Sequence, residues 1–265
     1  MSTVSAKTRA FHSFCWADLA CNDHGACKTF YKALFGWSAE DAPGKDGAPY
    51  TMLKSGDNEV GGMYQKDAEL LAHGGPSYWT SYVLVEDCDQ MAKNIESLGG
   101  KLCMPPFDVG GNGRMAIAFD PTGACFALWQ NSEKRDTPEL TGHGTFCWNE
   151  LLSKDPKTSI QFFQDLFGWS SKPFSDSSDD YTLFMQDGKE VGGVMALPEE
   201  AQKNGAPSYW LLYTAVDDCD KIVAKTKELG GSVHLPAKEF EGVGRGSVLA
   251  DPNGGTFGVI CLHHC

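Results

Sequence analysis

An eight-residue segment that occurs twice constrains this chain more than any other feature. The segment FYKALFGW (Phe30 to Trp37) returns as FFQDLFGW (Phe162 to Trp169) in the second half of the chain. Its apolar residues lie three to four apart, the spacing that puts side chains on one face of a helix. Gly36 and Gly168 predict the ends of the two helices, because glycine adopts the left-handed C-cap conformation without strain. One such helix predicts only a packed amphipathic element, but its repetition predicts a duplicated fold.

The remaining motifs of the two halves correspond in the same order. The matched pairs are VGGM from Val60 with VGGV from Val191, PSYW from Pro76 with PSYW from Pro207, LGG from Leu98 with LGG from Leu229, and FDPTGA from Phe119 with ADPNGG from Ala250. Each half also repeats internally, since a strand, an Asp-capped helix, a glycine turn and short strands describe both 11–64 and 77–130. One such βαβββ unit cannot cover both faces of its sheet. The sequence therefore predicts four units that pair, with helices outside and curved sheets around a cleft.

The predicted boundaries follow from the repeat and from a change in composition. Residues 132–144 are charged, contain Pro and Gly, and show no hydrophobic periodicity, which is typical of a linker. We predict one module at 10–131 and a second at 145–262. Residues 38–49, rich in Gly, Pro and Asp, are expected to form a loop.

Charge and composition narrow the possible partners. The chain has 265 residues and a formal net charge of −13, which disfavours nucleic acids and anionic membrane surfaces as partners. No apolar run reaches membrane-spanning length, and MSTVSAKTRAFHSF lacks the apolar core of a secretory signal, so a cytoplasmic protein is predicted. The ten cysteines include no CxxC pair and are interpreted as small buried hydrophobes.

These motifs resemble those of the vicinal oxygen chelate superfamily, which includes glyoxalase I, bleomycin-resistance proteins and extradiol dioxygenases. The similarity rests on D-x6-FY-x3-FGW from Asp23, on D-x6-FF-x3-FGW from Asp155, and on the paired LGG and DPxG turns. WADL at Trp16 and WNEL at Trp148 are similar to the module start of tandem glyoxalase-like bacterial proteins. The resemblance covers residues 10–262. It implies an α+β fold of two tandem glyoxalase-like modules, each a pair of βαβββ units with curved mixed sheets around a cleft.

The resemblance also implies where a divalent metal would be held, by His, Glu or Gln side chains on strands that face the cleft. Here those positions carry Trp16, Gly62, Thr80 and Ala127 in the first module and Trp148, Gly193, Leu211 and Gly258 in the second. A catalytic divalent metal needs about three side chains with lone pairs. We therefore predict no metal in either cleft and no other cofactor. His263, His264 and Cys265 are interpreted as an adventitious tail site at most.

Strand alternation assigns other side chains to the predicted clefts. The candidate ligand-binding residues are Trp16, Asp18, Tyr82, Arg114, Trp129, Trp148 and Tyr213, and the candidate catalytic residues are Glu150 and Arg245. Two interpretations of the arginines stay open. Arg114 pairs with Asp18, and Arg245 with Glu150, or each pairs with carbonyl groups, purely to hold strands together; or each guanidinium binds a carboxylate or phosphate of a ligand.

Two functions remain open on these residues. The favoured hypothesis is metal-independent binding of a small organic molecule, including sequestration as in bleomycin-resistance proteins, where the acidic surface would attract a cationic drug. The alternative is a lyase or isomerase that acts next to a carbonyl. Glu150 would then be the general base, and Arg245 would stabilise the enolate oxygen. In either case one module can be only a scaffold for the other.

The second module is expected to be the functional one. Glu150 reaches further than Asp18, its counterpart in the first module. Gly258 and Ile260 stand where the first module has an alanine and a tryptophan, which predicts more open volume in the second cleft.

Overall fold

The computed structural model describes residues 9–44, 47–132, 137–174 and 181–263. The first half contains β1 (Phe14–Cys21), α1 (His24–Phe35), β2 (Ser38–Pro43), β3 (Pro49–Ser55), β4 (Asn58–Gln65), α2 (Ala68–Ala72), β5 (Tyr78–Leu84), α3 (Cys88–Ser97), β6 (Lys101–Val109), β7 (Gly113–Phe119) and β8 (Cys125–Asn131). The second half repeats this order with β9 (Phe146–Ser153), α4 (Pro156–Phe167), β10 (Ser170–Pro173), β11 (Thr182–Gln186), β12 (Lys189–Ala196), α5 (Glu199–Lys203), β13 (Tyr209–Ala215), α6 (Cys219–Glu228), β14 (Ser232–Phe240), β15 (Gly244–Ala250) and β16 (Thr256–Leu262).

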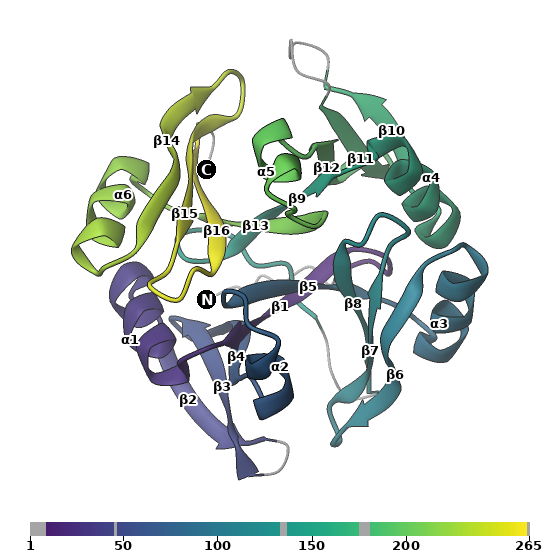
Figure 1. The fold of residues 1–265 in the computed structure, drawn as a ribbon, viewed down its shortest axis with the longest axis horizontal. Coiled ribbons are helices and arrows are strands. Elements are labelled where there is room, and N and C mark those ends of the chain that lie inside the picture. Colours follow the sequence, from purple (N-terminus) through teal and green to yellow (C-terminus); the bar gives the residue numbers. More distant parts are fainter. Residues whose placement is uncertain (1–8, 45–46, 133–136, 175–180, 264–265) are drawn as a thin grey trace, which may run out of the picture. The chain divides into compact units, whose positions relative to one another are not determined.

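The strands form two mixed eight-stranded sheets with the same topology (Figure 1). Their orders are β2-β3-β4-β1-β5-β8-β7-β6 and β10-β11-β12-β9-β13-β16-β15-β14. The registers also correspond, since Asp18 lies opposite Gly62 on the parallel pair β1–β4 and Glu150 lies opposite Gly193 on β9–β12. The predicted α+β fold of two tandem modules built from βαβββ units is confirmed.

Helices α1 and α4 begin and end where the sequence predicts. Asp23 caps α1 by accepting a hydrogen bond from the backbone N–H of Ala26, and Asp155 caps α4 in the same way. Such a side-chain oxygen satisfies an N–H group that the helix itself leaves without a partner. Gly36 and Gly168 end these helices at φ values of 73° and 70°. In contrast, residues 38–43 of the predicted loop form β2, because their backbone pairs with β3 in an antiparallel register.

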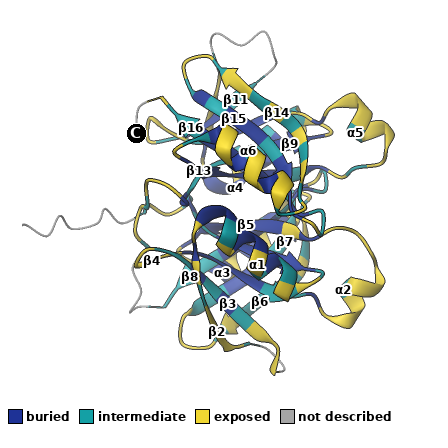
Figure 2. Cartoon of the chain, turned by 90° about the vertical axis from the view of Figure 1, so that its left-hand side faces the viewer, coloured by how far each residue is buried: buried dark blue, intermediate teal, exposed yellow. Residues whose placement is uncertain are grey.

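Each of the two compact units of the structure contains segments from both sequence repeats. Unit 1 contains Met1–Cys15, Ser81–Glu139 and Trp148–Trp210, and unit 2 contains Trp16–Thr80, Leu140–Cys147 and Leu211–Cys265. In unit 2, α1 of the first repeat lies beside α6 of the second, and in unit 1 α3 lies beside α4. The longer helices α1, α3, α4 and α6 bury one face and expose the other, whereas α2 and α5 have no buried residue and are largely yellow in Figure 2. Each apolar core therefore takes side chains from both repeats.

A buried polar network links the repeats within unit 2. The Tyr31 hydroxyl on α1 donates to Oδ2 of Asp251 at 3.0 Å and accepts from Nε1 of Trp79 at 3.1 Å. Burial is the main cause that raises the pKa of Tyr31 well above its usual value, so the hydroxyl keeps its proton. The DPNG turn that begins at Asp251 is thereby fixed to α1.

Unit 1 builds a corresponding arrangement without the tyrosine hydroxyl. Asp120 of the DPTG turn accepts from the Ser159 hydroxyl on α4 at 2.7 Å. Phe163 occupies the place of Tyr31 and packs edge-on against Trp210, with ring centroids 5.3 Å apart. Among the residues that the structure describes, Nε1 of Trp210 is one of two buried side-chain polar atoms without a hydrogen-bond partner.

Replacing Phe163 with tyrosine should therefore stabilise the protein by about 1 kcal/mol, since the new hydroxyl would accept from Nε1 of Trp210. The geometry supports this, because the Tyr31 and Trp79 rings pack at almost the same centroid distance, 5.4 Å. Urea denaturation measures the change. The reciprocal substitution Tyr31→Phe should destabilise by about 1–3 kcal/mol. If both variants lose stability, the space beside Phe163 does not admit a hydroxyl and the expectation is wrong.

Candidate functional site

The first module holds a tryptophan, a carboxylate and a tyrosine in mutual contact inside unit 2. Nε1 of Trp16 donates to Oδ1 of Asp18 at 3.0 Å and lies 3.2 Å from the Tyr50 hydroxyl, which itself donates to Oδ1 of Asp18 at 2.6 Å. Asp18 is only 8% exposed. A Cβ atom on Gly62 would lie 2.5 Å from Asp18 Oδ1 and closer still to the Tyr50 hydroxyl. Glycine at position 62 is what allows tyrosine and carboxylate to meet.

The second module repeats this cluster inside unit 1. Nε1 of Trp148 donates to the Tyr181 hydroxyl at 2.9 Å, and that hydroxyl is also hydrogen-bonded to Glu150. The Tyr181 ring lies over Gly193, where a Cβ atom would overlap it. Tyr209 is near enough for the Glu150 charge to act on it. We call these two groups the Trp–carboxylate–Tyr clusters: Trp16, Asp18 and Tyr50 in the first module, and Trp148, Glu150 and Tyr181 in the second.

The electrostatics of the second cluster define what its groups can do. Burial and the negative charge of Glu150 raise the pKa of Tyr181 far above its usual value, and the same two causes raise the pKa of Tyr209. Tyr181 therefore stays a proton donor at neutral pH. Glu150 and Trp148 are both partly exposed, so the cluster offers a carboxylate oxygen, a fixed phenol and aromatic surface to a bound molecule.

Tyr50 and Tyr181 were not among the predicted site residues, although the sequence carried a signal for them. They open the segments YTML and YTLF, which occupy matched positions in the two repeats. Strand alternation in the flanking strands gives no indication of these two side chains. The second glycine of VGGM and of VGGV, Gly62 and Gly193, makes room for them.

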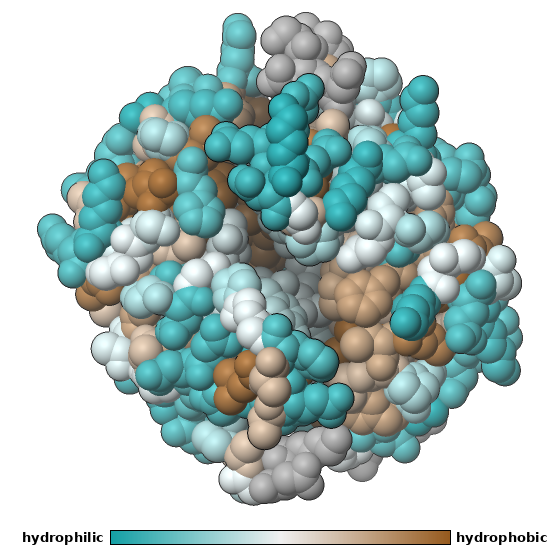
Figure 3. Space-filling model, in the orientation of Figure 1, coloured by the Kyte–Doolittle hydropathy of each residue, from teal (hydrophilic) through white to brown (hydrophobic). Residues whose placement is uncertain are grey.

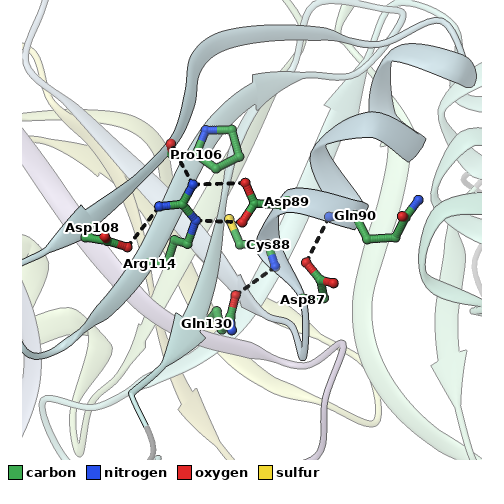
Figure 4. Close-up of polar contacts among 8 residues, drawn as sticks. All are labelled: Asp87, Cys88, Asp89, Gln90, Pro106, Asp108, Arg114 and Gln130. Carbon is green, nitrogen blue, oxygen red and sulfur yellow. Dashed lines mark hydrogen bonds and ion pairs between the residues drawn. The ribbon is translucent and has the colours of Figure 1, made fainter.

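The carboxylates that the two arginines bind are not the ones hypothesised, although Arg114 also binds a carbonyl group. Arg114 binds both oxygens of Asp89 at 2.7 and 2.9 Å, together with Asp108 and the Pro106 carbonyl (Figure 4). Arg245 repeats the bidentate contact with Asp220 at 2.7 and 2.9 Å. These pairs stand in place of the hypothesised pairing with Asp18 and Glu150, and they fix β7 to α3 and β15 to α6. A ligand carboxylate would have to displace a carboxylate already bound.

Three further predicted site residues have structural contacts that the sequence did not reveal. Tyr82 and Tyr213 are 3% and 6% exposed and lie opposite Ala127 and Gly258 on neighbouring parallel strands. The Tyr213 ring covers Gly258, and a Cβ there would lie 2.3 Å from it. The open volume expected at Gly258 is therefore filled by Tyr213. Trp129 is partly exposed, and its Nε1 donates to Asn131 at 2.7 Å.

The donor set does not fit the divalent metal that the fold family implies. Beside Asp18 and Glu150, the facing strands present Gly62 and Gly193, and tyrosine fills the space above each glycine. Across the described ranges, no group of three or more His, Cys, Asp or Glu side chains is arranged to hold a metal ion. Of the tail residues, His263 pairs with Glu239 at 2.5 Å, whereas His264 and Cys265 lie outside the described residues.

Elemental analysis of the purified protein should find divalent metal well below one equivalent per chain. The reason is that a single carboxylate hydrogen-bonded to tryptophan and tyrosine offers too few ligands to retain the ion. Dialysis against a chelator should leave the melting temperature unchanged. About one equivalent of Ni, Zn, Fe or Mn, with loss of stability on chelation, would contradict this expectation.

The face of the molecule drawn in Figure 3 is mostly hydrophilic, interrupted by smaller apolar areas. No helix in the described part of the chain is long and apolar enough to cross a membrane.

Comparison with known proteins assigns both halves to related families. Residues 13–128 match the model of the Glyoxalase/Bleomycin resistance protein/Dioxygenase superfamily, and residues 147–260 match that of a glyoxalase-like domain. "Putative glyoxylase CFP32" of Mycobacterium tuberculosis (strain CDC 1551 / Oshkosh) is 33% identical over 246 residues, covering 92% of this chain and 93% of its own length. "Anthracycline biosynthesis protein DnrV" of Streptomyces peucetius is 31% identical over 259 residues, covering 93% and 92%.

Solved structures share the fold at low sequence identity. The Mn(II)-bound glyoxalase from Novosphingobium aromaticivorans aligns with a TM-score of 0.65 and 16% identity, over 96% of this chain and 83% of that one. The 2,3-dioxygenase LapB from Pseudomonas sp. KL28 aligns with a TM-score of 0.64 and 12% identity, over 96% and 93%. With its duplicated cluster, its shared topology and two family models that together match most of its length, the chain belongs to the glyoxalase/bleomycin resistance protein/dioxygenase superfamily.

Proposed function

We propose that this protein binds a small organic molecule at its Trp–carboxylate–Tyr clusters, without the divalent metal that the fold family implies. The observation that carries the proposal is the second cluster, where the partly exposed Glu150 lies among Trp148, Tyr181 and Tyr209. Aromatic faces bind planar or cationic groups, and a carboxylate selects a positive charge or a hydrogen-bond donor. The second module is the better candidate because Glu150 is partly exposed, whereas Asp18 is buried beneath two donors.

The ligand class that best fits these groups is a planar aromatic compound that carries an amine. The net charge of −13 favours the approach of cations. Two relatives are named as anthracycline biosynthesis proteins, which supports polycyclic aromatic ligands. Sequestration in the cytoplasm follows as the simplest role.

The alternative function is a lyase or isomerase that acts next to a carbonyl, favoured by the relatives named as putative glyoxylases. Glu150 would then accept a proton from carbon. The structure favours Tyr181 over Arg245 as the group beside the developing oxyanion, because Tyr181 keeps its proton beside Glu150 whereas Arg245 is held by Asp220.

Calorimetric titration with an amine-bearing anthracycline and with its neutral aglycone tests the proposal. We expect the amine-bearing compound to bind more tightly, and Trp148→Ala to weaken both. The hemithioacetal of methylglyoxal and glutathione tests the alternative, since turnover there would establish the lyase. Absence of binding by both anthracyclines, or binding unchanged in Trp148→Ala and Trp16→Ala together, would overturn the binding proposal.

A further inference from the structure

Two cysteine thiols meet in unit 2, outside the Trp–carboxylate–Tyr clusters. Cys21 ends β1 and Cys27 lies on the first turns of α1, and both residues are fully buried. The Cys21 thiol donates to the Leu19 carbonyl at 3.6 Å and lies near enough to the Cys27 thiol for the two sulfurs to interact. The Cys27 sulfur also lies 3.5 Å from Nδ2 of Asn253 and 3.8 Å from the Ser77 hydroxyl. This pair packs against the same turn that Tyr31 holds.

The second repeat shows how close this strand–turn–helix brings the two positions. Ser153 and Ser159 replace Cys21 and Cys27, and their hydroxyl oxygens lie 2.8 Å apart. Each hydroxyl oxygen is bonded directly to its Cβ atom. The contact between the two oxygens is therefore compatible with the Cβ–Cβ separation of about 3.5–4.5 Å that a disulfide needs. Because the register of the two repeats corresponds here, Cys21 and Cys27 occupy the same neighbouring positions in the first repeat.

A buried lysine, Lys66, lies near the two cysteines. Lys66 is 3% exposed, and its ammonium group donates to the Pro76 carbonyl at 2.5 Å. The neighbouring Cys27 thiol and burial raise the pKa of Cys21, and the Lys66 charge acts in the opposite direction. In the second repeat Leu197 occupies the equivalent core position and is 1% exposed. The two thiols and the cation therefore occur together only in unit 2, among the described residues.

We propose that Cys21 and Cys27 form a reversible disulfide by exchange with a low-molecular-weight disulfide such as oxidised glutathione. The Cys27 thiolate attacks one glutathione sulfur, the glutathione disulfide bond breaks, and the departing thiolate takes up the proton that Cys27 released. The Cys21 thiolate then attacks Cys27 Sγ, which forms the Cys21–Cys27 bond and releases the second glutathione with the second proton. The cysteine pair is oxidised by two electrons, and glutathione disulfide is reduced to two thiols.

Access to the buried pair comes from the first turn of α1. Asp23 and Gly25, between the two cysteines, are exposed, and the Asp23 carboxylate caps the helix through Ala26 N at 2.9 Å. Helix ends open more readily than the core, so fraying of this turn exposes Cys27 without global unfolding. The disulfide would tie the end of β1 to α1, and β1 is the strand that carries Trp16 and Asp18.

The test equilibrates the full chain in glutathione buffers from reducing to oxidising, followed by acid quench, alkylation and peptide mapping. We expect a single two-electron transition to a Cys21–Cys27 linkage, abolished by Cys21→Ser or Cys27→Ser and unchanged by Cys15→Ser. Serine at both positions is compatible with the fold, since the second repeat has Ser153 and Ser159. Lys66→Leu, which copies Leu197, should slow the exchange.

Removing the helix cap tests how glutathione reaches the thiols separately from how stable the Cys21–Cys27 disulfide is. Asp23→Ala should speed disulfide formation about fivefold by opening the first turn, while the equilibrium between dithiol and disulfide changes little. The matched variant Asp155→Ala uncaps α4 and should leave the rate unchanged. No Cys21–Cys27 linkage at any glutathione ratio, a mixed glutathione adduct as the only product, or linkage of Cys21 to Cys15 would each overturn the proposal.

Discussion

Substitution of Asp251 by alanine should lower the free energy of unfolding by about 3–5 kcal/mol. The Asp251 carboxylate is 3% exposed and accepts backbone hydrogen bonds from Asn253 at 2.7 Å and Gly255 at 3.0 Å, besides that from the Tyr31 hydroxyl. Alanine would leave three buried donors without a partner, and each costs about 1–3 kcal/mol, offset in part by relaxation of the turn. Urea denaturation at neutral pH measures the loss. A change below about 1 kcal/mol would show that water replaces the carboxylate there.

The isosteric variant Asp251→Asn distinguishes the contribution of the Asp251 hydrogen bonds to the free energy of unfolding from the contribution of its charge. Burial raises the pKa of Asp251, so its folded pKa lies above the unfolded value of about 3.9. The stabilisation linked to this proton is present below about pH 4 and is lost as pH rises through the folded pKa. The stability of the wild-type protein minus that of Asp251→Asn should therefore fall between acidic and neutral pH. A constant or rising difference would contradict this assignment.

Replacing Glu150 with glutamine should weaken binding of the amine-bearing anthracycline about 10- to 100-fold and change stability by less than about 1 kcal/mol. Glutamine keeps an oxygen that can accept from Tyr181, so the cluster persists while its negative charge is removed. Affinity for the neutral aglycone should change little. Calorimetric titration of both compounds, together with thermal unfolding, measures the three quantities.

The matched control for this variant is Asp220→Asn, which weakens the exposed ion pair with Arg245. An exposed pair of this kind contributes little to stability, because solvent screens both charges. Stability should therefore change little and ligand affinity not at all. If Glu150→Gln instead destabilises the protein severely with unchanged affinity, Glu150 is a structural residue. The ligand site would then have to be sought elsewhere.

The fold could be predicted from the sequence because its strongest signals are local. The repeated FGW segment, the capping aspartates and the glycine stops each fix a helix within a few residues, and the duplicated motifs fix their order. Residues 38–43 were mistaken for a loop, because Pro and Gly suggest a turn whereas antiparallel pairing with β3 decides the outcome.

The candidate site was predicted less well, since strand alternation gives the direction of a side chain but not its neighbour. Trp16 with Asp18 and Trp148 with Glu150 were correctly placed together. The tyrosines that complete both clusters were missed. Tyr50 on β3 and Tyr181 just before β11 reach the carboxylates from two positions away in the sheet. The carboxylates that the arginines bind could not be predicted, because nothing local to Arg114 reveals that the first turn of α3 carries Asp89 into reach.

The division into units could not be predicted either. Hydrophobic periodicity shows which face of a helix is buried but not which sheet or helix covers it. That α1 packs beside α6 depends on side chains from different repeats, such as Tyr31 and Asp251, which no local pattern connects.

Neither repeat forms a complete hydrophobic core by itself. Tyr31 of the first repeat meets Asp251 of the second, and Ser159 of the second meets Asp120 of the first. One repeat alone could cover these faces only by association with an identical copy, so the present chain corresponds to a two-fold dimer carried in one polypeptide. In a true homodimer any substitution would change both contacts at once. In the single chain the two contacts can differ, and one has a thiol pair and a buried tyrosine where the other has serines and a phenylalanine.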